Sequence, residues 1–293
     1  MNVVGTSRIF LMKSLFNKYE ELTYSKLTEV CEQNGAHVFA KVRVADVCPI
    51  EGSGISDGDY SFALKAHFDF VITNHGYIPL FAVEFDGPLH RAKRQKDRDC
   101  RKDSLCDRFD FPLLRINSNY IDRQFRGLDL LTYFVEVWFM RVAFDEAQTQ
   151  GHVPNDEGFD PSFIVSDGRR KEHWPYWISF DLQVRLQNLA KTGKIHDYIP
   201  CHWIGCDSAS NYRCLAWLHT GADSYIIVET GMREQQFPVI VSDILWQIAV
   251  FDLCEKLDRI FKALAEPEAG HILDERLLFY QHNFEMRSSC SHG

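Results

Sequence analysis

The sequence predicts an α/β fold, because segments with helical periodicity alternate with short β-type runs along the first half of the chain. The chain has 293 residues, 45% of them hydrophobic, so it can bury ordinary cores in one large domain or two modest ones. Residues 151–174 carry Gly, Pro, Asp and Ser with little periodicity, which favours a domain boundary there. We therefore expect a first domain over residues 1–150, a linker over 151–174 and an α+β domain over 175–293.

The first half predicts helices and strands in the order of an α/β sandwich. In sequence order, the expected elements are a helix over about 8–34, a strand over 37–45, a Gly/Ser-rich loop over 51–58, an acidic hairpin within 67–90, a helix over 91–109, a strand over 112–117 and an apolar amphipathic helix over 128–150. The aromatic stripe of this last helix is expected to pack on the core of the first half or on a partner.

The second half predicts fewer elements. A helical stretch near 178–189 is followed by two strands, 212–219 and 224–230, which a turn at 220–223 joins into a hairpin. A long helix from about Ser242 comes next. The residues expected to form its buried stripe are Ile244, Ile248, Phe251, Cys254, Leu257, Phe261 and Leu264.

Two acidic residues stand inside apolar, aromatic strands of the expected hairpin, Asp69 in HFDFVIT and Glu84 in PLFAVEF. Asp is a poor strand former, and a carboxylate is rarely buried unless it is paired or metal-bound, so a divalent cation is the simplest explanation. If residues 74–78 form the turn, Asp69 faces Glu84, and Asp86 lies two residues further along on the same face. The residues expected on the opposite, core-facing side are Phe68, Phe70, Ile72, Phe81, Val83 and Phe85. The alternative is an amphipathic hairpin whose acids face water.

A basic segment follows the hairpin. Residues 91–102 read RAKRQKDRDCRK, with seven Lys or Arg against two Asp, in a chain whose formal net charge is -9. A positive run beside clustered carboxylates is the arrangement needed to hold a phosphodiester backbone over a metal. The arginines expected to bind nucleic acid are Arg91, Arg94 and Arg98. Helical spacing puts Gln95 and Lys102 on one face, so Lys102 could point at the strand carboxylates. The alternative is a solvated, charged helix surface.

These residues together resemble a known pattern. An acid in the first strand, Glu-x-Asp-Gly at 84–87, a His at 90, Asp-x-x-Lys at 99–102 and FPLLRI at 111–116 resemble the restriction-endonuclease-like PD-(D/E)xK nuclease superfamily, and are most similar to uncharacterised bacterial domains akin to the very-short-patch repair endonucleases. FAKVRVADV at 39–47 is similar to that branch too, so the resemblance covers about Glu20 to Asn117. It implies a mixed central sheet flanked by helices. Asp86 stands where the (D/E)xK triplet has Lys, and in several branches that lysine has moved to the following helix. Lys102 is then the replacement, with Lys93 or Lys96 as alternatives.

The resemblance also implies a set of catalytic roles. Asp69, Glu84 and the backbone carbonyl of Phe85 would bind one or two Mg²⁺ or Mn²⁺ ions, with Asp86 beside them, and the metal would activate a water for attack on a phosphodiester. Lys102 would orient that water or stabilise the transition state, and Gln95 would hold Lys102 or a phosphate.

Two further family positions are assigned less uniquely. A glutamate on the first helix leans over the metal in the family, and Glu20 is the acid whose helical spacing points inward, with Glu21 and Glu29 as rivals. An acid near a helix start is more often a surface residue that complements the helix dipole. His90 assists the water, contacts a phosphate or only closes the loop before the basic helix.

Composition and hydropathy exclude several classes of protein. No run reaches the length of a membrane-spanning helix, and Arg8–Phe16 is too short and interrupted for a signal peptide, so we expect a cytoplasmic protein with no membrane partner. Nine cysteines without regular spacing favour reduced thiols. The soft ligands clustered in the second half are Cys201, His202, Cys206 and Cys214. They lack the paired Cys-x-x-Cys knuckles of structural zinc sites, which favours buried thiols.

We therefore expect a metal-dependent nuclease acting on nucleic acid, with DNA as the substrate, in repair, restriction or phage defence. The alternative is a catalytically inactive nucleic-acid-binding or protein-interaction module that retains the fold. The second half shows no repeat or basic patch, and it is where we expect any homo-oligomer or protein partner to bind.

Overall fold

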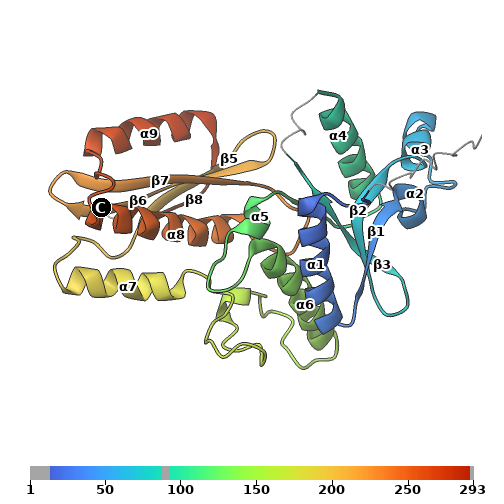
Figure 1. Cartoon of the computed structure of the whole chain (residues 1–293), viewed down its shortest axis with the longest axis horizontal. Helices are drawn as coiled ribbons and strands as arrows, with labels where there is room; N and C mark the ends of the chain where they lie inside the picture. Colours follow the sequence, from blue (N-terminus) through green and yellow to red (C-terminus); the bar gives the residue numbers. More distant parts are fainter. Residues whose placement is uncertain (1–13, 88–92, 291–293) are drawn as a thin grey trace, which may run out of the picture.

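Figure 1 shows the computed structural model of the chain, in which residues 14–87 and 93–290 are described, with residues 93–96 described for the backbone only. The first half contains α1 (Lys18–Gln33), β1 (His37–Arg43), α2 (Val44–Val47), α3 (Asp57–Ala63), β2 (His67–Thr73), β3 (Pro79–Phe85), α4 (Lys93–Arg108), β4 (Leu113–Ile116), α5 (Asn119–Asp122) and α6 (Leu130–Thr149). The second half contains a 3-10 helix (Pro161–Phe163), α7 (Phe180–Lys191), β5 (Cys201–Cys206), β6 (Asn211–Gly221), β7 (Ser224–Arg233), α8 (Val241–Phe261), α9 (Gly270–Asn283) and β8 (Glu285–Cys290).

The first half forms a mixed four-stranded sheet with the order β1-β2-β3-β4. β1, β2 and β3 pair antiparallel, whereas β4 runs parallel to β3 after the chain has returned through α4. Apolar side chains of one face pack with those of α1 and α6, and those of the other face pack with α2, α3 and α4. The α/β class expected from the sequence is confirmed, with helices on both faces of a mixed sheet.

The hairpin of β2 and β3 has the register that the sequence predicts. Phe70 pairs with Val83 and Ile72 with Phe81. The Asn74 side chain closes the turn by accepting the backbone N–H groups of Gly76 and Ile78 at 2.9 and 3.0 Å. The next position along the ladder places Asp69 across from Glu84.

One part of the predicted side-chain alternation is wrong. Phe70 and its β1 partner Ala40 pack on the α1 side of the sheet, whereas Phe68 and its partner Val42 pack on the α4 side. Lys41 lies between the two β1 residues with a left-handed backbone, φ 53°. This conformation interrupts the pleat, so the strands present Phe68 to the α4 side rather than to the core face that holds Phe70.

Helix α1 begins at Lys18, and the described residues 14–17 before it are not helical; residues 8–13 of the predicted helix lie outside the described residues. Asn17 caps α1 by accepting the backbone N–H groups of Tyr19 and Glu20, and the Glu20 side chain accepts the Asn17 N–H in return at 2.9 Å. This capping box fixes both the helix start and the direction of the Glu20 side chain. The sequence N-x-x-E at residues 17–20 is the pattern typical of such a capping box.

The second half forms a four-stranded sheet with the order β7-β6-β5-β8, in which all neighbouring strands are antiparallel. The predicted β6–β7 hairpin is confirmed, with Trp217 opposite Ile227. Cys214 and Ala216 face α8, whereas Leu215 and Trp217 face α9, so the two helices cover opposite faces (Figure 1). Among the described residues, no helix combines the length and apolarity needed to cross a membrane.

Two residues of the predicted α8 stripe are not buried. Phe261 is 49% exposed and Leu264 is 66% exposed, because the helix ends at Phe261 before its stripe can continue across the sheet. β5, α9 and β8 were not predicted. β8 reads EMRSSC and has little β character of its own, so its pairing with β5 determines the strand.

The two sheets are joined by a shared hydrophobic cluster and by one buried amide. Side chains from α6, α8 and both sheets belong to the same cluster. Gln235, which follows β7, accepts the Arg115 N–H at 3.0 Å and donates to the Arg115 carbonyl at 2.9 Å. Its amide therefore pairs with the outer edge of β4 as a neighbouring strand would, and also donates to the Tyr120 hydroxyl at 3.1 Å. The division into domains at 151–174 stays a prediction.

Candidate functional site

Asp69 and Glu84 lie beside each other where β2 and β3 separate. The Asp69 backbone N–H donates to Glu84 Oε1 at 3.2 Å, and the Phe85 backbone N–H donates to Asp69 Oδ2 at 3.0 Å. Beyond the Phe70–Val83 pair of the ladder, the carboxylates of Asp69 and Glu84 thus accept hydrogen bonds from backbone N–H groups of the opposite strand. The two carboxylates converge as the sequence predicts, and the Phe85 carbonyl stays a predicted ligand.

Lys102 points from α4 to this pair of carboxylates. Its ammonium donates to Glu84 Oε1 at 2.6 Å and to the His67 carbonyl at 2.8 Å, and lies 5.5 Å from the centre of the Phe68 ring. Glu84 is 4% exposed and Lys102 is 8% exposed, so the pair is shielded from water. The prediction that Lys102 faces the carboxylates is confirmed.

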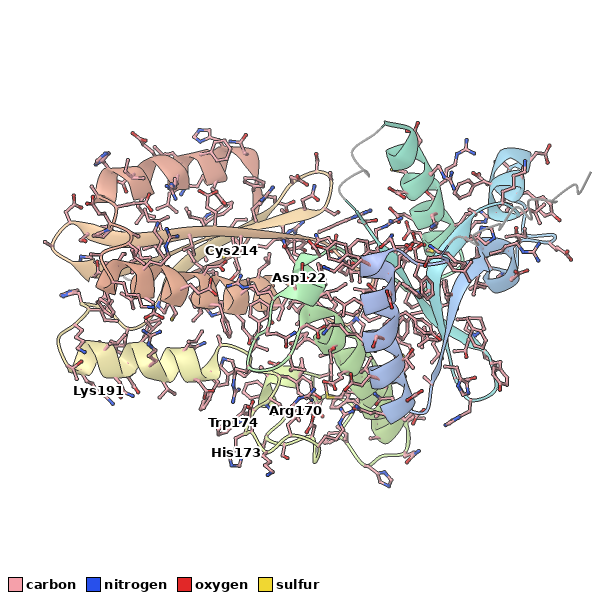
Figure 2. All side chains as sticks on the ribbon, in the orientation of Figure 1. Asp122, Arg170, His173, Trp174, Lys191 and Cys214 are labelled. Carbon is pink, nitrogen blue, oxygen red and sulfur yellow. The ribbon has the colours of Figure 1, made fainter. Side chains whose placement is uncertain are left out.

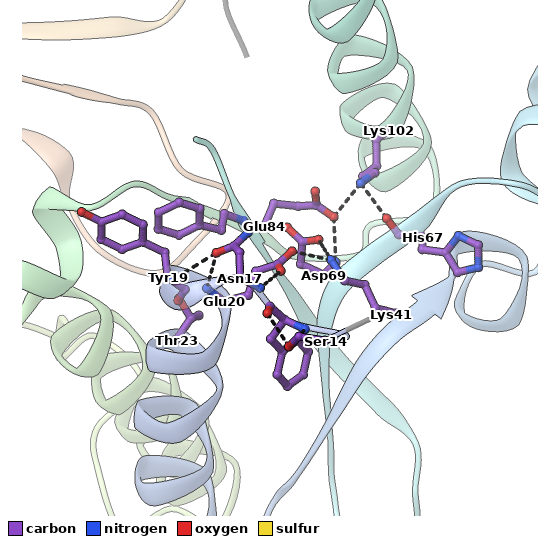
Figure 3. A network of polar contacts seen from close by, with 12 residues as sticks. Ser14, Asn17, Tyr19, Glu20, Thr23, Lys41, His67, Asp69, Glu84 and Lys102 are labelled. Atoms are coloured by element: carbon purple, nitrogen blue, oxygen red, sulfur yellow. Dashed lines mark hydrogen bonds and ion pairs between the residues drawn. The ribbon is translucent and has the colours of Figure 1, made fainter. Parts of the chain in front are cut away.

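Glu20 also reaches this cluster, through a lysine that the sequence analysis did not select. Figure 3 shows Lys41 between Glu20 and Asp69, and its ammonium lies 2.6 Å from Glu20 Oε1 and from Asp69 Oδ1. The rival acids Glu21 and Glu29 are exposed. Lys41 lies within the FAKVRVADV stretch, and its place opposite Asp69 in the β1–β2 pair was the signal that could have identified it.

Asp86 takes part in a different network. Arg115 Nη1 lies 3.0 Å from Asp86 Oδ1, and Arg115 Nε donates to Asp103 Oδ1 at 2.8 Å. Asp103 in turn accepts a hydrogen bond at 2.7 Å from Arg233, the last residue of β7 in the second half. Asp86 therefore pairs with Arg115, whereas Glu84 pairs with Lys102.

Burial shifts the protonation of the cluster. The pKa of Glu84 is raised to about 7, because lost hydration and the charge of Asp69 outweigh the attraction of Lys102. Partial burial lowers the pKa of Lys41, but hydrogen bonds and charge from Asp69 and Glu20 outweigh it, so this pKa lies above its usual value. Burial also lowers the pKa of Arg115, but the charges of Asp86 and Asp103 outweigh this effect, so the pKa of Arg115 lies above its usual value.

Several predicted residues cannot be placed in this site. His90 and Arg91 lie outside the described residues, as do the side chains of Lys93, Arg94, Gln95 and Lys96. Arg98 is described, and its side chain is exposed on α4, as is that of Arg101. Of the predicted basic helix, the structure therefore places Lys102 at the carboxylates and leaves Arg98 and Arg101 exposed on α4.

The donor set fits a hard divalent cation. Carboxylate oxygens of Asp69 and Glu84 are the ligands that Mg²⁺ prefers, and they lie on two rigid strands. Lys41 and Lys102 balance the charge of these acids, so a divalent cation on Asp69 Oδ1 would take the place of the Lys41 ammonium. Lys41 is 40% exposed at its side chain, which gives it room to move.

The cysteines do not form a metal site in the second half. Cys201 packs on the α9 side of the second sheet and Cys214 on the α8 side, so the two thiols cannot share an ion. Cys206 is also a buried free thiol, and His202 Nε2 lies 3.0 Å from the Ser288 hydroxyl. Buried thiols, the expected state, are confirmed.

Figure 2 shows how side chains fill the space around both sheets, with Cys214 inside the second one. Within the described part of the chain, the one group of three potential metal ligands whose ligand atoms all lie within 4.8 Å of one another consists of His196, Asp197 and His219. It lies at one end of β6, far along the sequence from the carboxylates of the first sheet.

A family model described as "Protein of unknown function (DUF2726)" matches residues 12–127. This range includes α1 and the whole first sheet, and with them Glu20, Lys41, Asp69, Glu84 and Lys102. No curated protein and no solved structure matches the chain.

Proposed function

We propose that this protein is a metal-dependent nuclease that hydrolyses phosphodiester bonds in nucleic acid, with DNA as the expected substrate. The observation that carries the proposal is the convergence of Asp69, Glu84 and Lys102 from three separate elements into one shielded cluster. Burying the Glu84 carboxylate is costly, because it loses its hydration. A chemical role explains why this carboxylate stands there.

Two further features support the proposal. The first sheet is mixed and has helices on both faces, as the resemblance to the PD-(D/E)xK superfamily leads us to expect. Arg98 and Arg101 are exposed on α4, the helix that carries Lys102, and exposed cations near the site suit a polyanionic substrate.

Each side chain of the cluster has a separate task in this proposal. Asp69 and Glu84 would hold Mg²⁺ or Mn²⁺, which when bound supplies an activated water and offsets charge on the leaving oxygen. Lys102 is buried against Glu84 and the His67 carbonyl, so it positions Glu84 rather than contacting the substrate. Lys41 is the more exposed lysine, and it is suited to orient the water or to contact the scissile phosphate.

A cleavage assay tests the proposal. Plasmid, single-stranded DNA and RNA are incubated with the protein in Mg²⁺, in Mn²⁺ and in EDTA. We expect metal-dependent cleavage that Asp69→Asn and Glu84→Gln abolish. Glu29→Gln removes an exposed acid of α1 and serves as the matched control, with cleavage as in the wild type. Cleavage that persists in Asp69→Asn, or in EDTA, contradicts the assignment of this site.

The roles of the two lysines are separated by kinetics and metal affinity. Lys41→Ala should lower kcat, since its task is at the reacting phosphate. Lys102→Ala should weaken Mg²⁺ binding as well as kcat, because it acts through Glu84. Equal loss of kcat in both variants with unchanged metal affinity contradicts the positioning role of Lys102.

The second candidate function is a nucleic-acid-binding module without catalysis. It is favoured by Asp86, which stands at the family's lysine position and is held by Arg115, and by the Lys41 ammonium between Glu20 and Asp69. Such a module binds nucleic acid equally well in EDTA and in Mg²⁺ and cleaves none of the three substrates.

A further inference from the structure

A cavity of about 370 Å³ lies at the junction of the two halves of the chain. It is bounded by the end of β4 and α5 on one side and by β6, β7 and α8 on the other. Neither half forms it alone. Its volume is that of a pocket for a small ligand, and it is far too small for a nucleic-acid duplex to enter.

The charged residues that line the cavity are mostly arginines. They are Arg115, Arg123, Arg213 and Arg233, against Asp86 alone. The lining side chains therefore carry more cations than anions, and acids outside the lining offset part of this charge. Arg123 is paired with Asp252 at 2.6 Å, and Arg115 and Arg233 are both held by Asp103.

Arg213 differs from the other three arginines. Across the described residues its guanidinium makes no ion pair with a carboxylate, and its side chain is exposed. It pairs in register with Gly231 of β7, and a Cβ at position 231 would lie 2.9 Å from both Arg213 Cδ and Nη1. Gly231 thus leaves the space in which the Arg213 side chain lies across β7 and along the cavity wall.

The uncharged lining suits a nucleotide rather than a bare phosphate. Asn117 and Asn119 offer exposed amides that can hydrogen-bond to base edges or sugar hydroxyls, and the half-buried Tyr212 offers an aromatic ring for a base. Arginine beside aromatic rings is the usual combination for holding an unpaired nucleotide.

The cavity lies close to the candidate catalytic cluster, although Asp69 and Glu84 do not line it. Asp86 lines it and follows Glu84 by two residues, a distance of about 7 Å along a strand. Arg115, which also lines it, pairs in register with Glu84. A strand lying on the carboxylates can therefore place its next nucleotide in the cavity.

We propose that this cavity binds one unpaired nucleotide of a nucleic-acid strand, with Arg213 holding its phosphate and Tyr212 contacting its base. The proposal rests on the proposed nuclease function for the role of the bound strand, since the second half would then position the substrate beside Asp69 and Glu84. Binding itself requires no metal and no cleavage, so it can be measured separately.

The test uses the full-length protein in EDTA, with a fluorescently labelled single-stranded oligonucleotide and a blunt duplex of the same length. Arg213→Gln should weaken binding to the single strand by about tenfold, the contribution of one charge-assisted hydrogen bond. Arg259→Gln removes an exposed arginine of α8 that does not line the cavity, and should bind within about twofold of the wild type. Unchanged binding by Arg213→Gln, or equal loss in Arg259→Gln, overturns the proposal.

Gly231→Ala provides a second variant that keeps every charge. The added methyl must displace the Arg213 side chain, so single-strand binding should fall as in Arg213→Gln while the melting temperature shows that the protein is folded. Competition identifies the ligand: a nucleoside monophosphate should displace the oligonucleotide at a lower concentration than inorganic phosphate. Equal competition by the two overturns the assignment to a nucleotide.

The two proposals fail in different ways. If no substrate is cleaved in Mg²⁺ or Mn²⁺ but single-strand binding depends on Arg213, the nuclease function fails and the cavity assignment stands. If Glu84→Gln abolishes cleavage while Arg213→Gln leaves both binding and cleavage unchanged, the cavity assignment fails and the nuclease function stands.

Discussion

The buried pair of Glu84 and Lys102 should behave as a coupled unit in stability measurements. Lys102 is 8% exposed, and Glu84→Leu leaves its ammonium with the His67 carbonyl, at 2.8 Å, as its remaining hydrogen-bond acceptor. Removing one partner of a buried ion pair typically costs about 3–5 kcal/mol, because the other charge stays buried without compensation. Replacing both partners, as in Glu84→Leu with Lys102→Met, should bring stability back to within about 1–2 kcal/mol of the wild type.

The same pair sets a pH dependence with a definite sign. The pKa of Glu84 is raised from 4.5 to about 7 by burial, so the folded protein binds more protons than the unfolded chain between these values. Its contribution to stability is therefore fully present below about pH 4.5 and is lost as the pH rises through 7. A shift of this size amounts to roughly 3 kcal/mol, and Glu84→Leu should remove this pH-dependent component.

Urea unfolding in EDTA between pH 5 and pH 8 measures both effects. The free energy of unfolding is obtained for the wild type, the two single variants and the double variant, and the double-mutant cycle gives the coupling energy. We expect a coupling of about 3 kcal/mol at pH 8. Glu84→Leu as stable as the wild type at pH 8, or single-variant effects that add without coupling, would refute the reasoning.

Three further perturbations follow from the structure. Lys41→Met should raise Mg²⁺ affinity several-fold in calorimetric titration, because the ammonium no longer competes for Asp69 Oδ1, and unchanged affinity would show that Lys41 does not stand at the metal position. Arg98→Gln should reduce the salt dependence of DNA binding by about one counterion in a plot of log K against log salt, and an unchanged slope would remove α4 from the interface. Gln235→Leu should lower the free energy of unfolding by about 1–3 kcal/mol, because the buried N–H and carbonyl of β4 lose their partner, whereas the exposed Gln236→Leu should change it little.

The carboxylate site could be predicted largely because its residues are close in sequence. Asp69 and Glu84 belong to one hairpin, whose turn and alternating pattern fix the register, and Lys102 follows on the next helix. Local rules of strand pairing and helical spacing are sufficient at this range. Glu20 was placed by helical periodicity, and its capping box with Asn17 supports the same direction.

Lys41 and the cavity required contacts that no local pattern specifies. Lys41 reaches Asp69 only through a left-handed backbone conformation in the middle of β1, which is unfavourable for lysine and is unexpected in a strand. The cavity joins residues such as Asp86 and Arg213 that are more than a hundred positions apart.

Local sequence patterns were sufficient to predict the α/β class, the hairpin register and the meeting of Asp69 with Glu84, because alternation and turn chemistry act over a few residues. The tertiary structure was needed to show that Lys41 of β1 pairs with Asp69 and Glu20. It also decided that Gln235 pairs with the edge of β4 and that the strand β8 forms against β5. These contacts depend on packing between distant segments, where burial and a partner's geometry outweigh the intrinsic preference of each residue.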